Sequence, residues 1–322
     1  MKAIVVNEFG LPDVMKLEEI PVPNVGASSV LVRVKAAGVN PVDTYIRSGT
    51  YAQKPNLPYI PGKDAAGIVE KIGENVTKFK IGDRVLTADS GSGTYADFCL
   101  CDENQLIKLP ENVSFEQGAG VFVPFATAYR ALFQKAKAQR NETVLIHGAS
   151  GGVGVAAIQW AKNAGLTVIG TAGSDDGKRL VKEQGADFVF DHSGENYLSE
   201  IVEVTNGKGV EIIIEMLANV NLVKDFDVLK MFGRIVVVGN RGSLDFNPRL
   251  TMGKDAAIHG LALFNAPESE MNEIHEAIFD GLSKGFLNPV VGKTFALADA
   301  VSAHREVIEQ KAFGKIILLT DN

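Results

Sequence analysis

The residues best suited to chemistry form one glycine-rich segment, residues 147–154 (HGASGGVG), between the apolar pair Leu145-Ile146 and a helical pattern over residues 155–165. This order predicts a strand, a tight turn and a helix start. Gly151 would let the backbone approach a pyrophosphate without a Cβ, and Gly154 would let the helix pack closely on its strand. The N-terminus of the helix offers unpaired N–H groups to an anion. Ala149 stands where the usual dinucleotide motif has its first glycine.

The end of the next strand predicts which nicotinamide cofactor binds. An NAD site usually has an acid about 20 residues after the glycine turn, to bind the ribose 2′-hydroxyl. That position here is Ser174, a neutral hydroxyl, with Lys178 and Arg179 one helical turn later. This set suits a 2′-phosphate and favours NADPH. Ser174 could also simply cap a helix whose positive end favours Asp175 and Asp176, with both bases solvated; the two interpretations are compatible.

Short apolar runs alternate with helical patterns on both sides of this strand. After residues 166–172 the expected strands lie at residues 188–190, 210–214 and 234–239, with a helical pattern reaching residue 230. Such alternation indicates a parallel sheet covered on both faces, whose ligands bind at the carboxyl ends of the strands. Residues 123–263 are therefore expected to form a Rossmann dinucleotide-binding domain, a doubly wound parallel sheet.

The first part of the chain has a different pattern. Apolar runs with alternation, separated by Gly and Pro turns, predict strands at residues 3–6, 30–34, 66–72, 83–88 and 95–101. These indicate an all-β, barrel-like domain over residues 1–122. A helical segment at residues 126–135 leads into the nucleotide domain. A helix at residues 299–311 and a strand at residues 314–319 are expected to complete the first domain, which takes residues 264–322.

Composition argues against a membrane protein, a secreted disulfide-rich protein and a nucleic-acid-binding protein. The chain has 322 residues, 46% of them hydrophobic, enough for two domains. No apolar run approaches the roughly 20 residues of a membrane span, and the N-terminus enters a strand without a signal peptide. Two cysteines, Cys99 and Cys101, are too few for a disulfide framework, so a cytoplasmic location is expected. The net charge of −7 offers nucleic acid no basic surface.

Five segments together resemble one protein superfamily: residues 37–49 (AGVNPVDTYIRSG), 82–85 (GDRV), 147–154, 170–173 (GTAG) and 215–221 (EMLANVN). The chain resembles the medium-chain dehydrogenase/reductase superfamily and, within it, the zinc-free quinone reductases of the zeta-crystallin type. The resemblance covers essentially the whole chain. It implies a GroES-like β-barrel catalytic domain, a Rossmann domain, and a homodimer or homotetramer built through the Rossmann domain.

The zinc enzymes of this superfamily differ from the chain at their metal ligands. Asn40 stands at their early Cys position, and Lys63-Asp64 stands at their His-Glu position. Their four-cysteine lobe has no counterpart, and the five histidines lack ligand spacing. No metal is therefore expected. Without a Lewis acid the enzyme would favour acceptors that delocalise charge themselves, as quinones do, and the protein would hold the reactants together and donate a hydrogen bond.

The resemblance also implies the catalytic residues. It places Tyr45 beside the nicotinamide, with Asn40 and Tyr51 near the substrate. Tyr45 is then the expected hydrogen-bond donor to the acceptor oxygen, although it could equally only pack on a helix with its hydroxyl on water. Asp43 is expected to brace that helix.

The cofactor contacts implied by the resemblance fall in five groups. They are Ser150, Gly151, Gly152 and Val153 at the pyrophosphate; Gly173, Ser174 and Lys178 around the adenosine ribose and its phosphate; His192 near the adenine or phosphate, with Asn221 near the adenosine side or the pyrophosphate; Val238, Gly239, Asn240 and Arg241 at the sheet edge; and Leu261, Ala262 and Leu263 beside the carboxamide.

These expectations converge on NADPH-dependent reduction of hydrophobic quinones. One alternative is an NADPH-dependent C=C reductase of enals or enones on the same fold, in which a donor such as Tyr45 would matter more. Another is a crystallin-like structural or RNA-binding protein; the acidic charge gives RNA binding no support.

Overall fold

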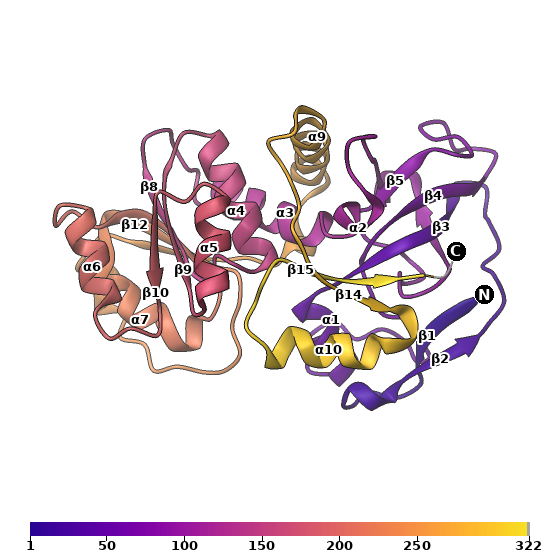
Figure 1. Ribbon diagram of the computed structural model, residues 1–322, viewed down its shortest axis with the longest axis horizontal. Coiled ribbons are helices and arrows are strands. Elements are labelled where there is room, and N and C mark those ends of the chain that lie inside the picture. The colour runs from indigo at the N-terminus through magenta and orange to yellow at the C-terminus, as the bar shows by residue number, and fades with distance from the viewer. Residues whose placement is uncertain (321–322) are drawn as a thin grey trace. The chain divides into compact units, whose positions relative to one another are not determined.

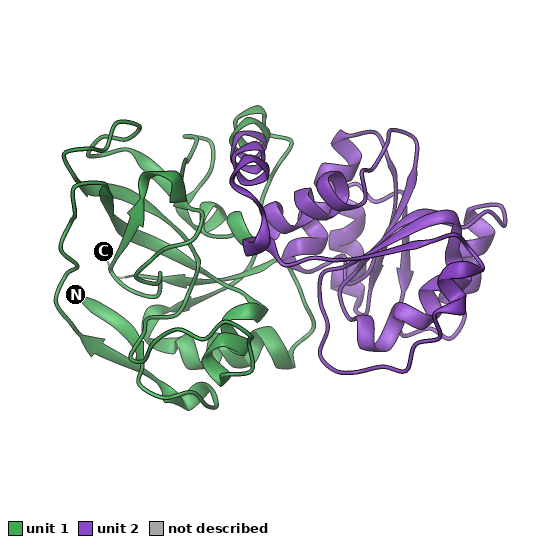
Figure 2. Ribbon diagram, turned by 180° about the vertical axis from the view of Figure 1, so that it is seen from behind, with its two compact units in different colours: residues 1–123, 279–322 green, residues 124–278 purple. Residues whose placement is uncertain are grey.

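The computed structural model describes residues 1–320, which form two compact units (Figure 2). Unit 1 comprises residues 1–123 and the chain from residue 279 onward, and unit 2 comprises residues 124–278. The sequence predicted divisions after residues 122 and 263. The contacts instead place most of one long helix, α9 (Glu268–Lys284), with unit 2.

Unit 2 is built on a six-stranded sheet in the order β10-β9-β8-β11-β12-β13, with every neighbouring pair parallel. Its strands are β8 (Thr143–Ile146), β9 (Thr167–Ala172), β10 (Phe188–Asp191), β11 (Val210–Glu215), β12 (Leu229–Val237) and β13 (Ala257–Gly260). Its connecting helices are α4 (Gly152–Asn163), α5 (Asp175–Glu183), α6 (Tyr197–Val204), α7 (Ala218–Val228) and α8 (Arg249–Met252). The predicted doubly wound parallel sheet is confirmed.

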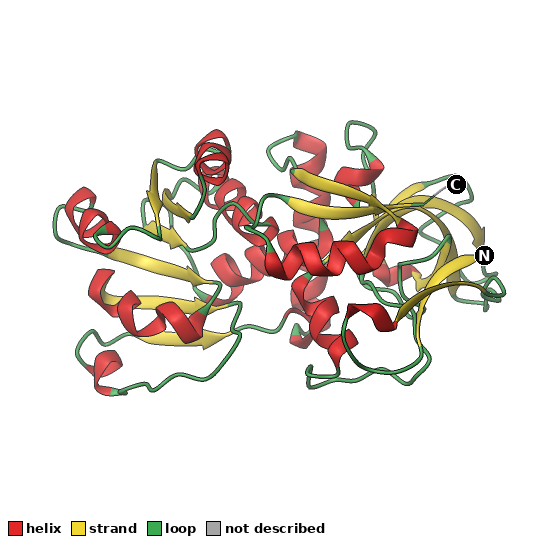
Figure 3. Cartoon of the chain, turned by 60° about the horizontal axis from the view of Figure 1, so that its bottom comes forward, coloured by secondary structure: helices red, strands yellow, loops and turns green. Residues whose placement is uncertain are grey.

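The sheet is buried because helices cover both of its faces. Helices α4 and α5 lie on one face and α6 and α7 on the other (Figure 1), and Figure 3 shows the same flanking of strands by helices. Right-handed crossovers require this arrangement, because the chain winds outward from β8 to β10 and then returns to β11 on the other side. The strand order therefore reverses between β8 and β11, and a crevice for ligands is expected at their carboxyl ends.

Unit 1 is built mainly from strands. Its seven-stranded sheet has the order β14-β15-β3-β4-β5-β7, with β6 paired to β3, and β1 and β2 form a separate pair. The strands are β1 (Lys2–Val6), β2 (Met15–Glu19), β3 (Ser29–Val39), β4 (Asp64–Ile72), β5 (Arg84–Thr87), β6 (Phe98–Asp102), β7 (Leu106–Lys108), β14 (Val291–Ala296) and β15 (Lys315–Leu319). Strand β3 pairs with β4, β6 and β15, so it organises the core of this unit.

The remaining helices are short or mixed. They are η1 (Pro12–Val14), α1 (Pro41–Ser48), η2 (Glu103–Gln105), α2 (Phe115–Gly118), α3 (Phe122–Tyr129), the π-helix η3 (Arg130–Lys135), η4 (Leu263–Asn265), η5 (Leu297–Asp299) and α10 (Ala300–Glu309). The single helix predicted at residues 126–135 is thus an α-helix continued by a π-helical stretch. In the described part of the chain, no helix is long and apolar enough to cross a membrane.

The glycine at position 154 is required by close packing inside unit 2. A Cβ there would lie 2.5 Å from Ala149 Cα and 2.6 Å from the Gly148 carbonyl oxygen. These contacts belong to the turn that joins β8 to α4, so Gly154 lets α4 begin close against that turn. Backbone atoms cannot move aside as the end of a side chain can.

We therefore expect Gly154→Ala to destabilise the protein by about 1–3 kcal/mol, the usual cost of overpacking. For a unit of this size that corresponds to a fall in melting temperature of roughly 2–10 °C, measurable by thermal denaturation. Gly253→Ala is the matched control, because a Cβ at Gly253 makes only an ordinary contact, 3.5 Å from the Arg249 carbonyl oxygen. Equal melting temperatures for both variants would contradict the packing argument.

Candidate functional site

The glycine-rich turn joins β8 to α4 at the point where the strand order reverses. Gly148 has a left-handed backbone, with φ of +55°, whereas Gly151 is the extended N-cap of α4, with φ −81° and ψ 173°. Any residue can adopt the Gly151 conformation, so its backbone does not require glycine. Gly151, Gly152 and Val153 are half-buried at the helix start, while Ser150 is buried. The start of α4 is thus partly accessible, and glycine at position 151 keeps it free of a Cβ.

The end of β9 gathers the residues predicted to surround the adenosine ribose. Ser174 is the N-cap of α5, and its Oγ accepts from the Gly177 N–H at 3.1 Å, so the capping interpretation is confirmed. Lys178 Nζ lies 3.0 Å from both Asp175 Oδ1 and Asp191 Oδ2. These two carboxylates raise the pKa of Lys178. Lys178 is therefore a cation held at the carboxyl edge of the sheet.

His192 and Gly173 lie together. A Cβ on Gly173 would be 2.7 Å from His192 Nε2, so the imidazole rests against the glycine that follows β9. His192 itself is exposed. Two residues that are 19 positions apart in the sequence are therefore neighbours at the carboxyl edge, as a common ligand would need.

The residues after β12 are held by the first turn of α7. Asn219 Oδ1 accepts from the Arg241 N–H and the Asn219 N–H donates to Asn240 Oδ1, both at 2.9 Å, while the Arg241 side chain is exposed. Val238 is half-buried. Gly239 allows close packing, because a Cβ there would lie 2.2 Å from the Met216 carbonyl oxygen.

Three further predicted residues follow β13. Leu261 is half-buried, Ala262 is exposed and Leu263 is buried. The side chain of Leu263 therefore packs into the fold, which leaves Leu261 and Ala262 as the accessible members of this segment.

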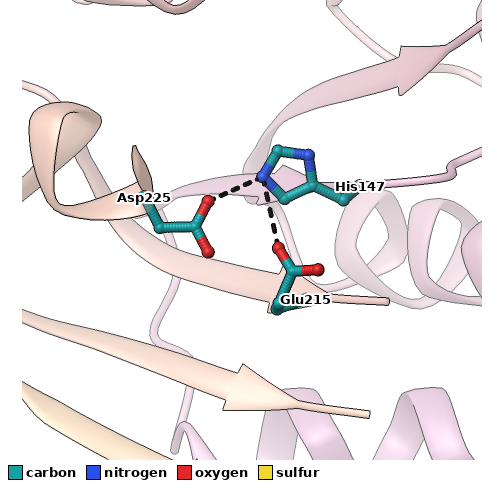
Figure 4. Close-up of side chains that lie close together, drawn as sticks. All are labelled: His147, Glu215 and Asp225. Atoms are coloured by element: carbon teal, nitrogen blue, oxygen red, sulfur yellow. Dashed lines mark hydrogen bonds and ion pairs between the residues drawn. The ribbon is translucent and has the colours of Figure 1, made fainter. Parts of the chain in front are cut away.

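A buried cluster of charged residues lies directly under the turn. His147 follows β8, Glu215 ends β11 and Asp225 projects from α7 (Figure 4). His147 Nε2 is 2.9 Å from Asp225 Oδ1 and 3.6 Å from Glu215 Oε2, and His147 Nδ1 is 3.5 Å from Thr171 Oγ1. Each residue offers one atom that could bind a metal ion, a ring nitrogen of His147 or a carboxylate oxygen of Glu215 and Asp225, and these atoms lie within 4.8 Å of one another. The five histidines are scattered along the sequence without ligand spacing, so this cluster was not predicted.

Burial controls the protonation of the cluster. Desolvation lowers the pKa of His147, so its imidazole is neutral and Nε2–H donates to Asp225. Desolvation raises the pKa of Glu215 and of Asp225, and the Asp225 carboxylate raises that of Glu215 further. Two buried carboxyl groups whose oxygens lie within 4.8 Å disfavour each other's ionisation, which favours a proton held by the pair.

Asn221 belongs to the same network. Its Nδ2 donates to Glu215 Oε1 at 3.2 Å, and the Leu217 N–H donates to the same oxygen. The carboxylate of Glu215 therefore links the end of β11, the start of α7 and the Asn221 amide.

In unit 1, Tyr45 lies on α1, whose start is fixed by a capping box. The Asn40 N–H donates to Asp43 Oδ2 at 2.8 Å, and the Tyr95 hydroxyl donates to the same oxygen at 3.2 Å. Desolvation raises the pKa of Asp43 to about 6. Asp43 thus braces the helix, as predicted. Tyr45 is half-buried, and its carbonyl oxygen accepts from the N–H of Tyr51, also half-buried, at 3.2 Å.

Asn40 belongs to a second buried network, in unit 1. Its Nδ2 donates to Asp64 Oδ2 at 3.0 Å, and Lys315 Nζ donates to Asn40 Oδ1 and, at 3.0 Å, to Asp64 Oδ2. All three side chains are buried. An ammonium group thus lies between the two positions at which the resemblance would place zinc ligands. Lys315 was not predicted, because it stands some 250 residues from its partners in the sequence.

Two family models match the chain. The model "Zinc-binding dehydrogenase" matches residues 152–280, and "Alcohol dehydrogenase GroES-like domain" matches residues 26–111. They fall in units 2 and 1 respectively, apart from the last two residues of the first match, and support the predicted fold class of a Rossmann domain with a GroES-like domain.

Similar proteins cover the full length. The chain is 48% identical to the quinone oxidoreductase of Homo sapiens over 99% of this chain and 98% of the relative, and 49% identical to that of Rattus norvegicus over the same shares. The solved structure of Escherichia coli quinone oxidoreductase complexed with NADPH superposes with a TM-score of 0.90, at 30% identity, over 99% of this chain and 100% of that one. The chain belongs to the quinone oxidoreductase family of the medium-chain dehydrogenase/reductase superfamily.

Proposed function

We propose that this protein is an NADPH-dependent quinone reductase that works without zinc. The observation that carries the proposal is the donor set at the carboxyl edge of the unit 2 sheet: a glycine turn open at the start of α4, next to Lys178 after β9. The full-length similarity to quinone oxidoreductases supports the acceptor class. The structure solved with NADPH supports the cofactor.

The residues of unit 2 fit NADPH by their chemistry. Gly152 and Val153 present backbone N–H groups to the pyrophosphate, and Ser150 lies at the same turn. Gly151, whose N–H donates to the Gly148 carbonyl oxygen at 3.1 Å, contributes the space that its missing Cβ leaves. Lys178 holds the 2′-phosphate beside the hydroxyl of Ser174, and His192 and Gly173 flank the adenosine. When bound, NADPH supplies the hydride. Asn221, the segment 238–241, Leu261 and Ala262 line the rest of the cofactor's path along the sheet edge, and the buried Leu263 holds this last segment in place.

The residues of α1 serve the acceptor. Tyr45 donates a hydrogen bond to the quinone oxygen on which negative charge develops, and Tyr51 lies beside it. Asn40 acts through position, because its amide is already bonded to Asp64 and Lys315 and its backbone starts α1. A quinone delocalises the incoming charge over its ring, so one positioned donor is sufficient.

The absence of a zinc requirement is supported by the charges around Asn40. The carboxylate of Asp64 is neutralised by the ammonium of Lys315, and Lys63 is paired with Asp89 at 2.7 Å. A divalent cation would have to displace an ammonium group that already satisfies this oxygen set. The residues therefore do not suit zinc.

A homo-oligomer is supported by the free edge of the unit 2 sheet. Strand β13 is the last strand on its side, and unpaired edges favour pairing with another chain. Three large apolar side chains nearby are exposed, Met231, Phe232 and Met252.

The free, buried thiols of Cys99 and Cys101 suit the reducing cytoplasm.

The direct test is turnover with 9,10-phenanthrenequinone, followed by the loss of NADPH absorbance. We expect rapid oxidation of NADPH, slower oxidation of NADH, and no change after incubation with EDTA. Activity only with an unsaturated aldehyde would replace quinone reduction by C=C reduction, and inactivation by EDTA would overturn the zinc-free mechanism.

Lys178→Glu tests the 2′-phosphate site. The substitution places a third carboxylate beside Asp175 and Asp191, so we expect KM for NADPH to rise roughly 10- to 100-fold, the loss of one charge-assisted hydrogen bond. KM for NADH should change little. Lys208→Glu is the control, because it makes the same charge change at an exposed residue before the amino end of β11. Equal effects on both cofactors would remove the role of Lys178.

Tyr45→Phe separates hydrogen bonding from packing. The variant keeps the ring and loses the donor, so we expect kcat for quinone reduction to fall by roughly 10- to 1000-fold while the dissociation constant of NADPH stays within about twofold. Steady-state kinetics and a cofactor titration measure the two quantities. An unchanged kcat would leave Tyr45 with a packing role only.

A further inference from the structure

The buried cluster of His147, Glu215 and Asp225 joins two strands of the unit 2 sheet to α7. Ile146 of β8 lies opposite Ile214 of β11, so the next residues, His147 and Glu215, meet at the carboxyl ends of the two strands. This is where the strand order reverses. The third member, Asp225, stands four residues after Asn221 on α7, which places both on one face of the helix.

The distances within this cluster suit a proton better than a metal ion. His147 Nε2 and Asp225 Oδ1 are 2.9 Å apart, a hydrogen-bond distance. Tetrahedral ligands about 2.0–2.1 Å from a zinc ion lie about 3.4 Å from one another, so a metal would have to separate this pair. Glu215 Oε2 and Asp225 Oδ2 are buried without a hydrogen-bond partner in the described residues. A proton on Glu215 Oε2 would supply a donor where two acceptors now face each other.

We propose that Glu215 is a positioning residue for the cofactor site, and that its neutral carboxyl group, held against the His147–Asp225 pair, fixes the Asn221 amide and the start of α7 for NADPH. The protonated oxygen is Oε2, because Oε1 is the acceptor for Asn221 Nδ2 and the Leu217 N–H. Loss of the proton sets two buried carboxylates against each other and adds a negative charge under the pyrophosphate turn. This inference rests on the cofactor site of the proposed function.

The surroundings of the cluster leave few other groups that could titrate with it. Tyr197 of α6 faces both carboxyl groups, and its pKa is raised by burial and then by Asp225 and Glu215. From β9 the cluster meets the neutral hydroxyl of Thr171. His147 stays neutral above its lowered pKa. In the alkaline range the carboxyl pair is therefore the group that changes charge.

The direction of the pH effect follows from the raised pKa of both carboxyl groups. A folded-state pKa above the unfolded value contributes stability that is present in acid and is lost as the pH rises through the folded-state pKa. Binding of NADPH should follow the same course, because the bound form needs the neutral carboxyl. We expect the dissociation constant of NADPH to rise about tenfold between neutral pH and pH about 9.5, as for a linked pKa shift of about one unit.

Glu215→Gln tests this in the full-length protein. Glutamine keeps an acceptor for Asn221 and Leu217 and carries a permanent donor in place of the proton. The dissociation constant of NADPH, measured by cofactor fluorescence from pH about 7 upward, should then stay nearly flat. Glu211→Gln makes the same change at the other end of β11, where Glu211 pairs with Lys230. In this variant the dissociation constant of NADPH should rise with pH as it does in the wild type. Asp225→Asn also removes the pair of like charges and should flatten the profile if Glu215→Gln does not fold.

Other outcomes would overturn the inference. A wild-type affinity that does not change with pH, or the same alkaline loss in Glu215→Gln and in the wild type, would show that no proton on Glu215 positions the site, while the proposed function stands. A change in the wild-type profile or melting temperature on adding EDTA would assign the cluster to a cation. NADPH binding at no pH would remove the proposed function itself, and the role of Glu215 with it.

Discussion

Between β8 and β11 the chain leaves two neighbouring parallel strands in opposite directions, which is where open parallel sheets bind their ligands. Buried ionisable residues, His147 and Glu215, stand at the carboxyl ends of these two strands. Gly154 can approach the turn only because it lacks a Cβ, and the extended Gly151 leaves the helix start open. The predicted cofactor residues lie together because the strands are parallel, which places the carboxyl ends of β8, β9, β11 and β12 along one edge.

Buried charge is handled in a similar way in each unit. In unit 2 the His147–Asp225–Glu215 cluster ties two strand ends to α7, and in unit 1 the Asn40–Asp64–Lys315 network ties β4 and β15 to the start of α1. Such groups would be costly if they were left unpaired. In both places they fix the origin of a helix that carries predicted functional residues, Asn221 on α7 and Tyr45 on α1. The buried polar groups are thus part of how the fold positions its surface.

Local pattern was sufficient to predict the parallel sheet and the glycine turn. The run LIHGASGGVG is typical of a strand, a turn and a helix start within ten residues. Ser174 follows the turn at the distance in sequence where dinucleotide-binding proteins contact the ribose. Strands β13 and β14 were not predicted, because their side chains are partly or fully exposed and the apolar signal is weak. The two buried networks were missed for another reason. Asp225 within a helical pattern resembles a solvated acid, and Lys315 resembles a surface lysine, until the sheet order brings their partners beside them.

The account depends most on a cofactor pyrophosphate passing directly over Gly151. Fluorescence titration of NADPH against the wild type and Gly151→Val tests this claim, with thermal denaturation of both proteins to show that the extended N-cap accepts valine. We expect saturable binding by the wild type and a loss of at least about 100-fold in affinity for the variant, since the valine side chain would fill the space of the phosphates. A folded Gly151→Val protein that binds NADPH as tightly as the wild type would contradict it.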